Sequence, residues 1–286
     1  MGVILILLMS VKSPISRRRF LRTLTLGACL MPFSRSLGRM SNVLGLHPET
    51  PLVDLPKVPL IPPQVMLPPF HSAIIGTPHL ALTFDDGPHP KLTPRLLDLL
   101  ADREVKATFF VIGEKVEAHP DIARRIVEEG HEIANHTWTH PVLSKISAAR
   151  VTEELRLTHE KVLHVTGSTM TALRPPYGAF NGEVRKIAFD RHAYDTIMWS
   201  VDPLDWKYRN SARVRRELLK GAAPGAVLLS HDIHATTVAA MPETIDLLQT
   251  RGFHLTTVQA LQAMDKSGRL DSNQRPPAPK AGALPS

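Results

Sequence analysis

Short apolar runs alternate with segments of helical character along the middle of the chain. The runs are rich in β-branched and aromatic residues, as is typical of buried strands, and span residues 80–84, 107–112, 132–134, 172–174, 196–201, 226–230 and 254–256. The segments between them predict helices over residues 93–100, 121–129, 147–167, 211–220, 242–250 and 258–264, with another after Asn181. A repeat of about seven strand–helix units indicates an α/β domain whose parallel sheet closes into a barrel.

Two segments that flank this repeat lack its periodicity. Residues 42–76 contain eight prolines, which favours an extended linker or a strap lying over the domain. Residues 266–286 are polar and rich in Pro, Gly and Ala, which predicts a disordered tail. We therefore expect a single catalytic domain over residues 77–265.

The positive charge of the chain is confined to its first residues. The formal net charge is +7, and residues 1–41 hold no acidic residue but seven basic ones: Lys12, Arg17, Arg18, Arg19, Arg22, Arg35 and Arg39. The remainder has 27 basic and 27 acidic residues, so its net charge is zero. This distribution argues against nucleic acid as a partner, because nucleic-acid-binding domains carry a basic surface.

The basic segment has the form of an export signal. Ser16 to Arg22 match the twin-arginine pattern, and an apolar stretch follows over residues 24–33. Residues 1–41 are therefore predicted to be a twin-arginine-type signal region that directs the protein to the periplasm or the cell exterior. Cys29, the single cysteine, lies in this region and leaves open a lipid anchor; we expect membrane contact only through the signal or such an anchor. The sequence does not indicate an oligomeric state.

Two polar strings in the repeat carry the first candidate chemistry. Asp85 and Asp86 follow the first apolar run, and His136 and His140 lie four residues apart after the third. One carboxylate and two imidazoles form a common catalytic set for a divalent metal, and the second carboxylate stays available as a base. Asp-Asp-Gly alone would favour a turn, but the two strings together indicate metal-assisted hydrolysis.

Further polar residues follow later strands, at the end of a barrel where active sites are built. Arg174 begins the string Arg-Pro-Pro-Tyr-Gly, which suits either a backbone donor aimed at an oxyanion or a rigid structural loop. Asp202 and His231 each follow a strand, and an Asp that orients a His keeps it protonated and able to act as an acid. Trp206 and Leu229 suit an apolar slot for a methyl group or ordinary core packing.

Five ordered segments together resemble one known family. They are Thr83 to Pro88, His136 to Pro141, Arg174 to Gly178, Asp202 to Trp206 and Leu229 to His231. The chain resembles the polysaccharide deacetylases with the NodB homology domain, carbohydrate esterase family 4, over about residues 77–265. The resemblance implies a distorted (β/α)7-type barrel.

The resemblance also implies a role for each residue. Asp85 would be the general base, held by Arg174, and His231 the general acid, oriented by Asp202. Asp86, His136 and His140 would bind the metal, with Zn²⁺ expected and Co²⁺ or another divalent ion as alternatives. The Tyr177 backbone N–H would serve the oxyanion hole, and Trp206 and Leu229 would line the acetyl pocket.

These roles predict removal of N-acetyl groups from N-acetylglucosamine residues of a glycan such as peptidoglycan or chitin. Two alternatives remain. The same barrel could hydrolyse acetyl esters of xylan or a non-glycan amide, or the domain could be an inactive glycan-binding module. Acetate release and metal content discriminate among the three.

Overall fold

The computed structural model describes residues 65–274, with side chains described as far as residue 267. Several sequence predictions therefore lie outside the described residues. They are the signal region 1–41 with Cys29, residues 42–64 of the Pro-rich segment, and residues 275–286 of the tail. Within the described part, no helix is both long enough and apolar enough to cross a membrane.

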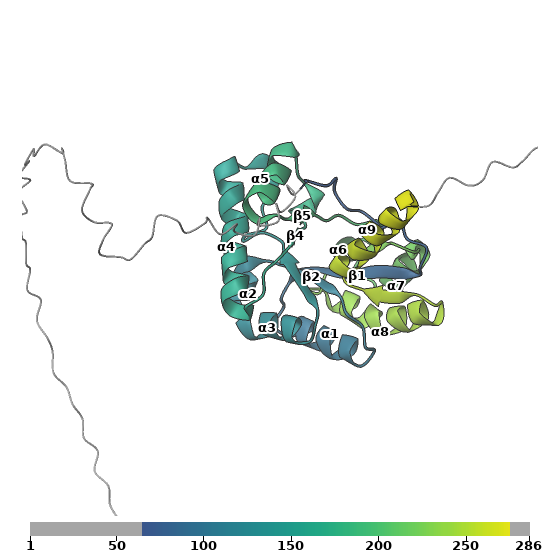
Figure 1. Ribbon diagram of the computed structural model, residues 1–286. Helices are drawn as coiled ribbons and strands as arrows, with labels where there is room; N and C mark the ends of the chain where they lie inside the picture. Colours follow the sequence, from purple (N-terminus) through teal and green to yellow (C-terminus); the bar gives the residue numbers. More distant parts are fainter. Residues whose placement is uncertain (1–64, 275–286) are drawn as a thin grey trace, which may run out of the picture. The chain divides into compact units, whose positions relative to one another are not determined.

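Seven parallel strands form one curled sheet, which confirms the predicted distorted barrel (Figure 1). The hydrogen-bonded order is β5-β4-β3-β2-β1-β6, and β7 also pairs with β1. The strands are β1 His79–Gly87, β2 Thr108–Val111, β3 Glu132–Asn135, β4 Ala172–Leu173, β5 Asp195–Thr196, β6 Val227–Leu228 and β7 His254–Thr256. Because all pairings are parallel, the carboxyl ends of the strands meet at one end of the barrel.

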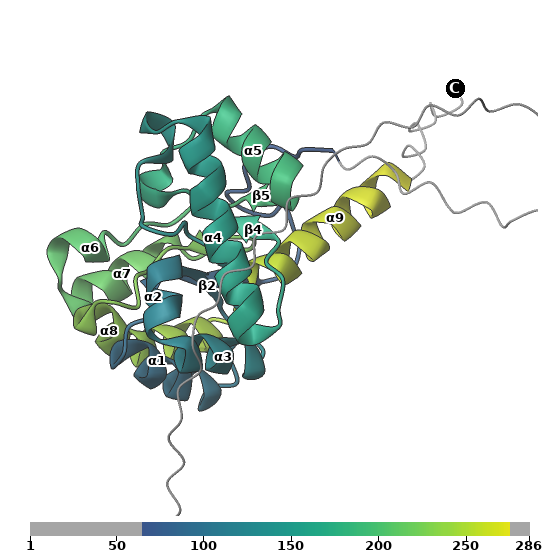
Figure 2. The ribbon, with the colours of Figure 1, turned by 90° about the vertical axis from the view of Figure 1, so that its left-hand side faces the viewer.

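Helices surround the sheet (Figure 2). Two of them begin at the polar caps expected from the sequence: the Ser147 and Asn181 side chains each accept a hydrogen bond from a backbone N–H in the first turn. The helices are α1 Leu92–Ala101, α2 Gly113–Ala118, α3 Pro120–Glu128, α4 Ala148–Thr166, α5 Gly182–His192, α6 Asp205–Tyr208, α7 Ser211–Gly221, α8 Ala235–Thr250 and α9 Val258–Gln274.

Three helical features differ from the sequence predictions. Helix α8 begins at Ala235 and holds Pro242 in its interior, whereas Pro242 was expected to start the helix. Helix α9 continues to Gln274, so the prediction of a disordered tail from residue 266 is wrong for residues 266–274. The short helices α2 and α6 were not predicted, because neither contains enough turns to show a period.

Successive strand residues alternate between two apolar clusters. In β1, Leu80 and Leu82 face the helices and Ala81 faces the barrel interior. The interior cluster also holds buried residues from other elements, namely Phe110, Ala134, Ala172, Ile197, Val227, Val258 and Leu261. Further along β1, Thr83 and Asp85 are buried polar residues, so the barrel becomes polar toward its carboxyl end.

Helix α9 closes the opposite end of the barrel. The Val258 N–H donates to Thr108 Oγ1 at 2.9 Å, and the Gln259 N–H donates to Glu132 Oε2 at 3.0 Å. Thr108 and Glu132 are the first residues of β2 and β3. These side chains satisfy N–H groups that a helix start leaves without partners, and they hold α9 to the amino end of the barrel.

Candidate active site

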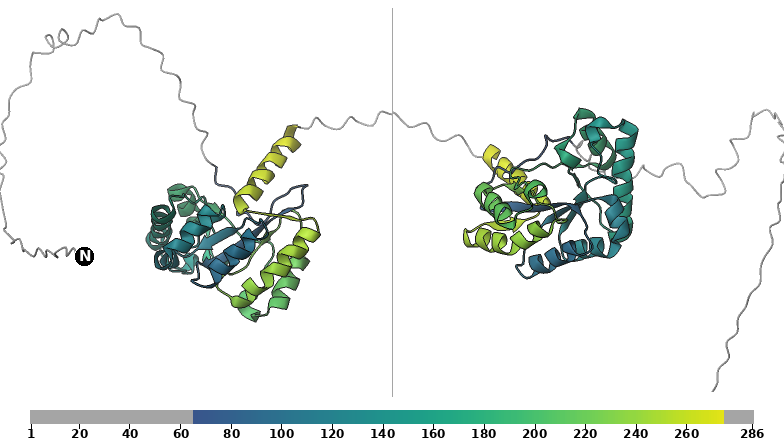
Figure 3. Two further views of the ribbon diagram at one scale, coloured as in Figure 1. Left: turned by 90° about the horizontal axis from the view of Figure 1, so that it is seen from below. Right: turned by 180° about the vertical axis from the view of Figure 1, so that it is seen from behind.

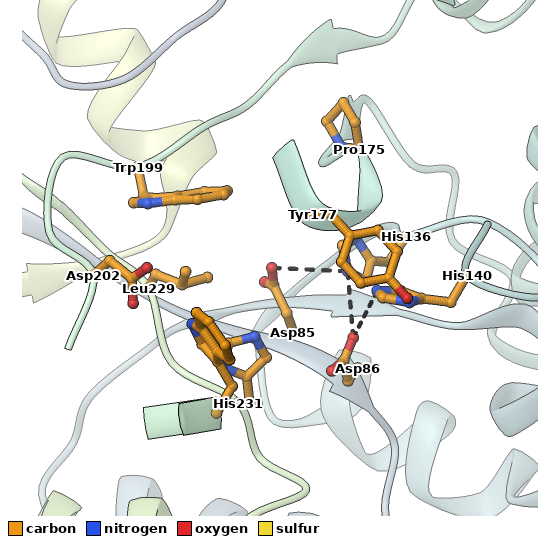
Figure 4. A pocket seen from close by; sticks show the side chains of 11 residues that line it. Asp85, Asp86, His136, His140, Pro175, Tyr177, Trp199, Asp202, Leu229 and His231 are labelled. Atoms are coloured by element: carbon orange, nitrogen blue, oxygen red, sulfur yellow. Dashed lines mark hydrogen bonds and ion pairs between the residues drawn. The ribbon is translucent and has the colours of Figure 1, made fainter. Parts of the chain in front are cut away.

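Three predicted metal ligands converge at the carboxyl end of the barrel (Figure 4). Asp86 is the penultimate residue of β1, and His136 and His140 lie in the loop after β3. Asp86 Oδ1 is 3.4 Å from His136 Nε2 and 3.2 Å from His140 Nε2, and the three ligand atoms lie within 4.8 Å of one another.

The chemistry of this cluster fits a divalent cation. Asp86 Oδ1 is buried without a hydrogen-bond partner, which is costly for a carboxylate unless a cation binds there. Burial by itself raises the pKa of Asp86, but His136 and His140 outweigh it and hold the pKa far below its ordinary value. The carboxylate is therefore ionised, and one carboxylate with two imidazoles suits zinc and similar ions.

Contacts behind the histidines orient their rings. His136 Nδ1 lies 2.7 Å from the Arg174 carbonyl oxygen, and His140 Nδ1 lies 3.2 Å from the Tyr177 hydroxyl. An N–H at Nδ1 that donates to such an acceptor leaves the Nε2 lone pair facing the cluster, as ligation requires.

The backbone at this site is held in the left-handed region at four non-glycine residues. Asp86, Thr137, His140 and Tyr177 have φ of 71°, 72°, 62° and 59°. Left-handed backbone is unfavourable for residues with a Cβ and persists only where the surroundings impose it, commonly at functional sites. Lys115 contributes one such constraint, because its Nζ donates to the Asp86 carbonyl oxygen at 2.6 Å.

The second carboxylate of the Asp pair has a separate partner. Arg174 Nη1 donates to Asp85 Oδ1 at 2.6 Å and to Thr83 Oγ1 at 2.7 Å, and Arg174 is fully buried. Asp85 Oδ2 lies 3.9 Å from His136 Nε2, so the carboxylate borders the metal cluster. This arrangement leaves Asp85 held by its arginine and facing the same cavity as the ligands (Figure 4).

Asp205, and not Asp202, orients His231. Asp205 Oδ1 lies 2.7 Å from His231 Nδ1, and Asp205 Oδ2 accepts from the His231 N–H at 2.9 Å and Thr237 Oγ1 at 2.7 Å. The left-handed backbone at Leu204 (φ 54°) starts α6 at Asp205 and directs this carboxylate inward.

The predicted role of Asp202 is thus corrected. Its Oδ1 accepts a hydrogen bond from the Leu204 N–H at 2.7 Å, which is a local turn contact, although the residue still lines the cavity. In Figure 4 Asp202 lies beside Leu229, on the opposite side of the cavity from the predicted metal ligands His136 and His140.

His231 is a strong base in this setting. Burial, the largest single effect, lowers the pKa of His231, but the hydrogen bond and charge of Asp205 and the charges of Asp85 and Asp86 raise it to about 9. The imidazole is therefore protonated at neutral pH and can donate a proton. Two of the charges that raise this pKa belong to Asp85, whose backbone is bridged to that of His231, and to Asp86.

A cavity of about 470 Å³ joins these groups. It is lined by Asp85, Asp86, His136, His140, Pro175, Tyr177, Trp199, Asp202, Trp206, Leu229 and His231. Trp206 is half exposed at the rim, and Leu229 is buried. The sequence analysis did not identify Trp199 as a cavity residue, because it placed Trp199 inside a predicted strand. In the structure β5 ends at Thr196, so the alternation of side chains along a strand does not tell which way Trp199 points.

Asp232 follows His231 and was not assigned a role from the sequence. It is fully buried, its Oδ2 accepts from Thr93 Oγ1, and burial, the largest effect, raises its pKa to about 7. A Cβ at Gly87 would lie 2.4 Å from Asp232 Oδ2, so only glycine fits after the Asp pair. Asp232 therefore packs beneath the loop that carries Asp86.

Glu154 is a second residue that the motifs did not reveal. This fully buried residue of α4 accepts from the Trp138 N–H at 2.8 Å, the Thr139 N–H at 2.7 Å and Thr139 Oγ1 at 2.8 Å. Its Oε1 also pairs with Arg150 Nη2 at 2.6 Å. One carboxylate thus holds the turn between the two histidine ligands.

Replacing Glu154 by Ala should weaken metal binding roughly 10–100-fold, as loss of supporting contacts around ligands does. It should also lower the free energy of unfolding by about 2 kcal/mol or more, because buried N–H groups lose their acceptor. Competition with a chromogenic chelator measures the first effect, and urea unfolding measures the second. Glu153→Ala, on the exposed side of the same helix, is the control; equal metal affinity in both variants would contradict this role for Glu154.

Comparisons with known proteins agree with this geometry. A sequence model of the family described as polysaccharide deacetylase matches residues 75–193. The chain is 43% identical over 182 residues to the peptidoglycan-N-acetylglucosamine deacetylase PgdA of Listeria monocytogenes, covering 64% of this chain and 38% of PgdA. It is 35% identical to the chitooligosaccharide deacetylase of Rhizobium leguminosarum bv. trifolii, covering 65% of this chain and 93% of that protein.

A solved structure has the same fold. The crystal structure of a CE4 family pseudoenzyme from Bacillus anthracis superimposes with a TM-score of 0.65 at 30% identity, covering 68% of each chain. Since a pseudoenzyme shares the barrel, the fold alone does not settle activity. The side chains in the cavity must carry that argument.

Proposed function

We propose that this chain, which belongs to the polysaccharide deacetylase family, removes N-acetyl groups from N-acetylglucosamine residues of a glycan and releases acetate. One observation carries the proposal. A single cavity joins an Asp/His/His cluster, a carboxylate held by a buried arginine, and a histidine paired with a buried aspartate. These are the groups that amide hydrolysis requires: an electrophile site, a base and an acid.

Asp85 serves as the general base. Its carboxylate takes a proton from the water that attacks the amide carbon, and the hydrogen bond from Arg174 keeps it pointed at the cavity. The tetrahedral oxyanion that forms is stabilised by the Tyr177 backbone N–H, in the turn after β4. Asp86, His136 and His140 would hold a divalent cation, which would supply Lewis acidity toward the amide carbonyl and toward water.

His231 serves as the general acid. It gives a proton to the amide nitrogen as the carbon–nitrogen bond breaks, so that the leaving group departs as a neutral amine rather than an amide anion. Its pKa of about 9 keeps it charged until that step. The methyl of the acetyl group lies against Trp206 and Leu229 in this scheme, where a small apolar slot excludes bulkier acyl groups.

We further propose that the cation is Zn²⁺. The set of two imidazoles and one carboxylate with room for a water or substrate oxygen is a common catalytic zinc set. Co²⁺ binds similar donors, so the comparison of the two metals is part of the test. Metal analysis of the purified protein, with one equivalent expected per chain, checks the assignment.

Peptidoglycan in the periplasm is the substrate polymer that we favour. This choice rests on the export pattern of residues 16–33 and on the likeness to PgdA, of which the chain spans 38%. We propose that the twin-arginine route exports the protein. Cell fractionation with and without an active twin-arginine system tests this proposal. Unchanged export after replacement of Arg17, Arg18 and Arg19 by Lys would contradict it.

Two other functions are tested by the same assay. An acetylxylan esterase would prefer acetylxylan, and a non-glycan amide hydrolase would release no acetate from these glycans. An inactive glycan-binding module would bind glycan and release nothing. The pairing of His231 with Asp205 and of Asp85 with Arg174 favours turnover, because a binding site gains nothing from a matched acid and base.

The experiment measures acetate released from peptidoglycan, chitin oligomers, poly-N-acetylglucosamine and acetylxylan. We expect release from at least one N-acetylglucosamine polymer, loss of nearly all release after treatment with a chelator, and recovery when Zn²⁺ is returned. Circular dichroism before and after chelation shows that the fold persists. Release from acetylxylan alone, or from none of the four substrates with metal bound, would reject the proposal.

A further inference from the structure

Residues 65–74 precede the part of the chain that the family sequence model matches, and they have no role in the scheme above. We call this segment the strap. It passes between β5 and β6, the two ends of the strand order, with a parallel bridge from Phe70 to Ile197 and an antiparallel bridge from Ser72 to Ala226. The strap therefore lies between these two edges of the sheet, which also meet directly through the parallel bridge from Val201 to Leu228.

The close approach on the β6 side requires a glycine. The Ala73 N–H donates to the Gly225 carbonyl at 2.9 Å, and a Cβ on Gly225 would lie 2.0 Å from the Ala73 carbonyl oxygen. Gly225 also has φ of 79°, which disfavours any side chain there. The strap is thus fitted to the barrel at both edges, as an integral part of the domain that was expected to begin at residue 77.

On the β5 side, a path of hydrogen bonds leads from the strap to Asp85. The Phe70 N–H donates to the Thr196 carbonyl at 2.9 Å, and the Met198 N–H donates to the Phe70 carbonyl at 2.8 Å. The Met198 carbonyl accepts from Arg174 Nη2 at 2.9 Å. Arg174 Nη1 in turn donates to Asp85 Oδ1 at 2.6 Å.

Packing follows the same path. The Phe70 ring packs against the interior cluster that includes Phe110 and Ile197, with Trp199 also against that cluster. The Arg174 guanidinium carbon lies 4.0 Å from the centroid of the Phe110 ring and 5.8 Å from that of Trp199. His71 Nδ1 is 3.4 Å from the Trp199 carbonyl oxygen. The strap thus borders the interior cluster that contacts the Arg174 guanidinium through Phe110. It also contacts the segment that carries Trp199 into the cavity.

We propose that Phe70 is a positioning residue for the reaction: its ring anchors the strap against the interior cluster, and the anchored Phe70 backbone holds Met198. The Met198 carbonyl then holds the Arg174 guanidinium, which aims the Asp85 carboxylate. The inference rests on the proposed function of the site and extends it to a segment outside the shared motifs. The segment after β5 needs such support, because β5 ends at Thr196 and Met198 lies beyond the ladder. A small displacement of Arg174 would misplace the base at the moment of attack.

The test compares full-length Phe70→Ala and Phe70→Leu with the unaltered protein. Phe70→Ala should lower kcat for acetate release roughly 10–100-fold with little change in KM and in metal content, as expected when a catalytic group is misplaced. Phe70→Leu keeps apolar volume at the interior cluster and should restore most of kcat. Ile74→Ala is the matched control, because the Ile74 side chain is 78% exposed in the same strap.

A readout without substrate accompanies the kinetics. The guanidinium N–H resonances of Arg174, assigned with Arg174→Lys, should be sharp and protected in the unaltered protein and broadened in Phe70→Ala. Val214→Ala, in α7, supplies a variant with an apolar core cavity on the outer face of the sheet, so that a general loss of stability can be subtracted.

The outcomes separate the two claims. If the unaltered, metal-loaded protein releases no acetate, the proposed function fails, and the Arg174 resonances alone decide the positioning role. If Phe70→Ala matches the unaltered protein in kcat and in these resonances, the inference is overturned. It is also overturned if Val214→Ala lowers kcat as much as Phe70→Ala at equal loss of stability.

Discussion

Replacing Asp85 by Asn should lower acetate release roughly a thousandfold while the protein retains its metal. The amide matches the shape of the carboxylate and its oxygen can still accept from Arg174 Nη1, but it cannot take a proton from water. The three metal ligands are other residues, so the bound metal should stay near one equivalent. Acetate release and elemental analysis on the same sample measure both quantities.

The size of the loss and the retention of metal must be observed together. Asp121→Asn, a change on the exposed start of α3, serves as the control for loss of one surface carboxylate. If Asp85→Asn loses its metal, Asp85 belongs to the binding cluster rather than acting beside it. Turnover within a few-fold of the unaltered enzyme would remove Asp85 from the role of base.

The second large expected effect is a loss of kcat on replacement of Asp205 that replacement of Asp202 does not produce. Asp205→Asn should lower kcat roughly 10²–10⁴-fold, because the acid loses the carboxylate that orients its ring and holds its proton. Asp202→Asn should change kcat little, since an Asn oxygen can accept from the Leu204 N–H and preserve the turn. The opposite ranking would restore the assignment made from the motif.

The pH profile gives an independent reading of the same pair. His231 acts as an acid only while protonated, so activity should fall as pH rises through its pKa of about 9. Removing the Asp205 charge lowers that pKa, so the alkaline limb of kcat should move to lower pH in Asp205→Asn and stay in place in Asp202→Asn. Rates between pH 6 and 10 measure the shift, and an unmoved limb in Asp205→Asn would contradict the pairing.

The same shift affects stability, and its sign follows from the direction of the shift. The folded pKa of His231 lies above its ordinary value of 6.5, so the folded state binds the proton more tightly than the unfolded chain. The resulting stabilisation is fully present below about pH 6.5 and is lost as pH rises through about 9. Asp205→Asn should flatten this dependence, which thermal unfolding at several pH values measures.

Barrel architecture was predictable from the sequence because the longer strands and helices carry a local period and some of the helices carry a polar cap. The apolar runs, Ser147 and Asn181 marked the strands and helix starts without reference to the rest of the chain. Elements without a period were missed: α6 has four residues, and α8 continues through Pro242 because tertiary packing outweighs the local preference.

For the candidate site, the motifs located the residues but not all of their partners. The Asp/His/His cluster could be predicted, since strand ends in a parallel barrel meet at one edge. The choice between Asp202 and Asp205 depends on a left-handed backbone at Leu204, a non-glycine residue for which the sequence carries no mark. Glu154 and Phe70 act from other elements, and only the folded structure brings them to the site.

The attachment of α9 has a practical consequence. Its first turn is fastened to Thr108 and Glu132 at the amino end of the barrel, and the helix then extends away from the body (Figure 3). The catalytic mouth opens at the other end. A tether placed on the last turns of α9 should therefore let the protein be fixed to a bead or a surface while its mouth still reaches an insoluble cell-wall polymer.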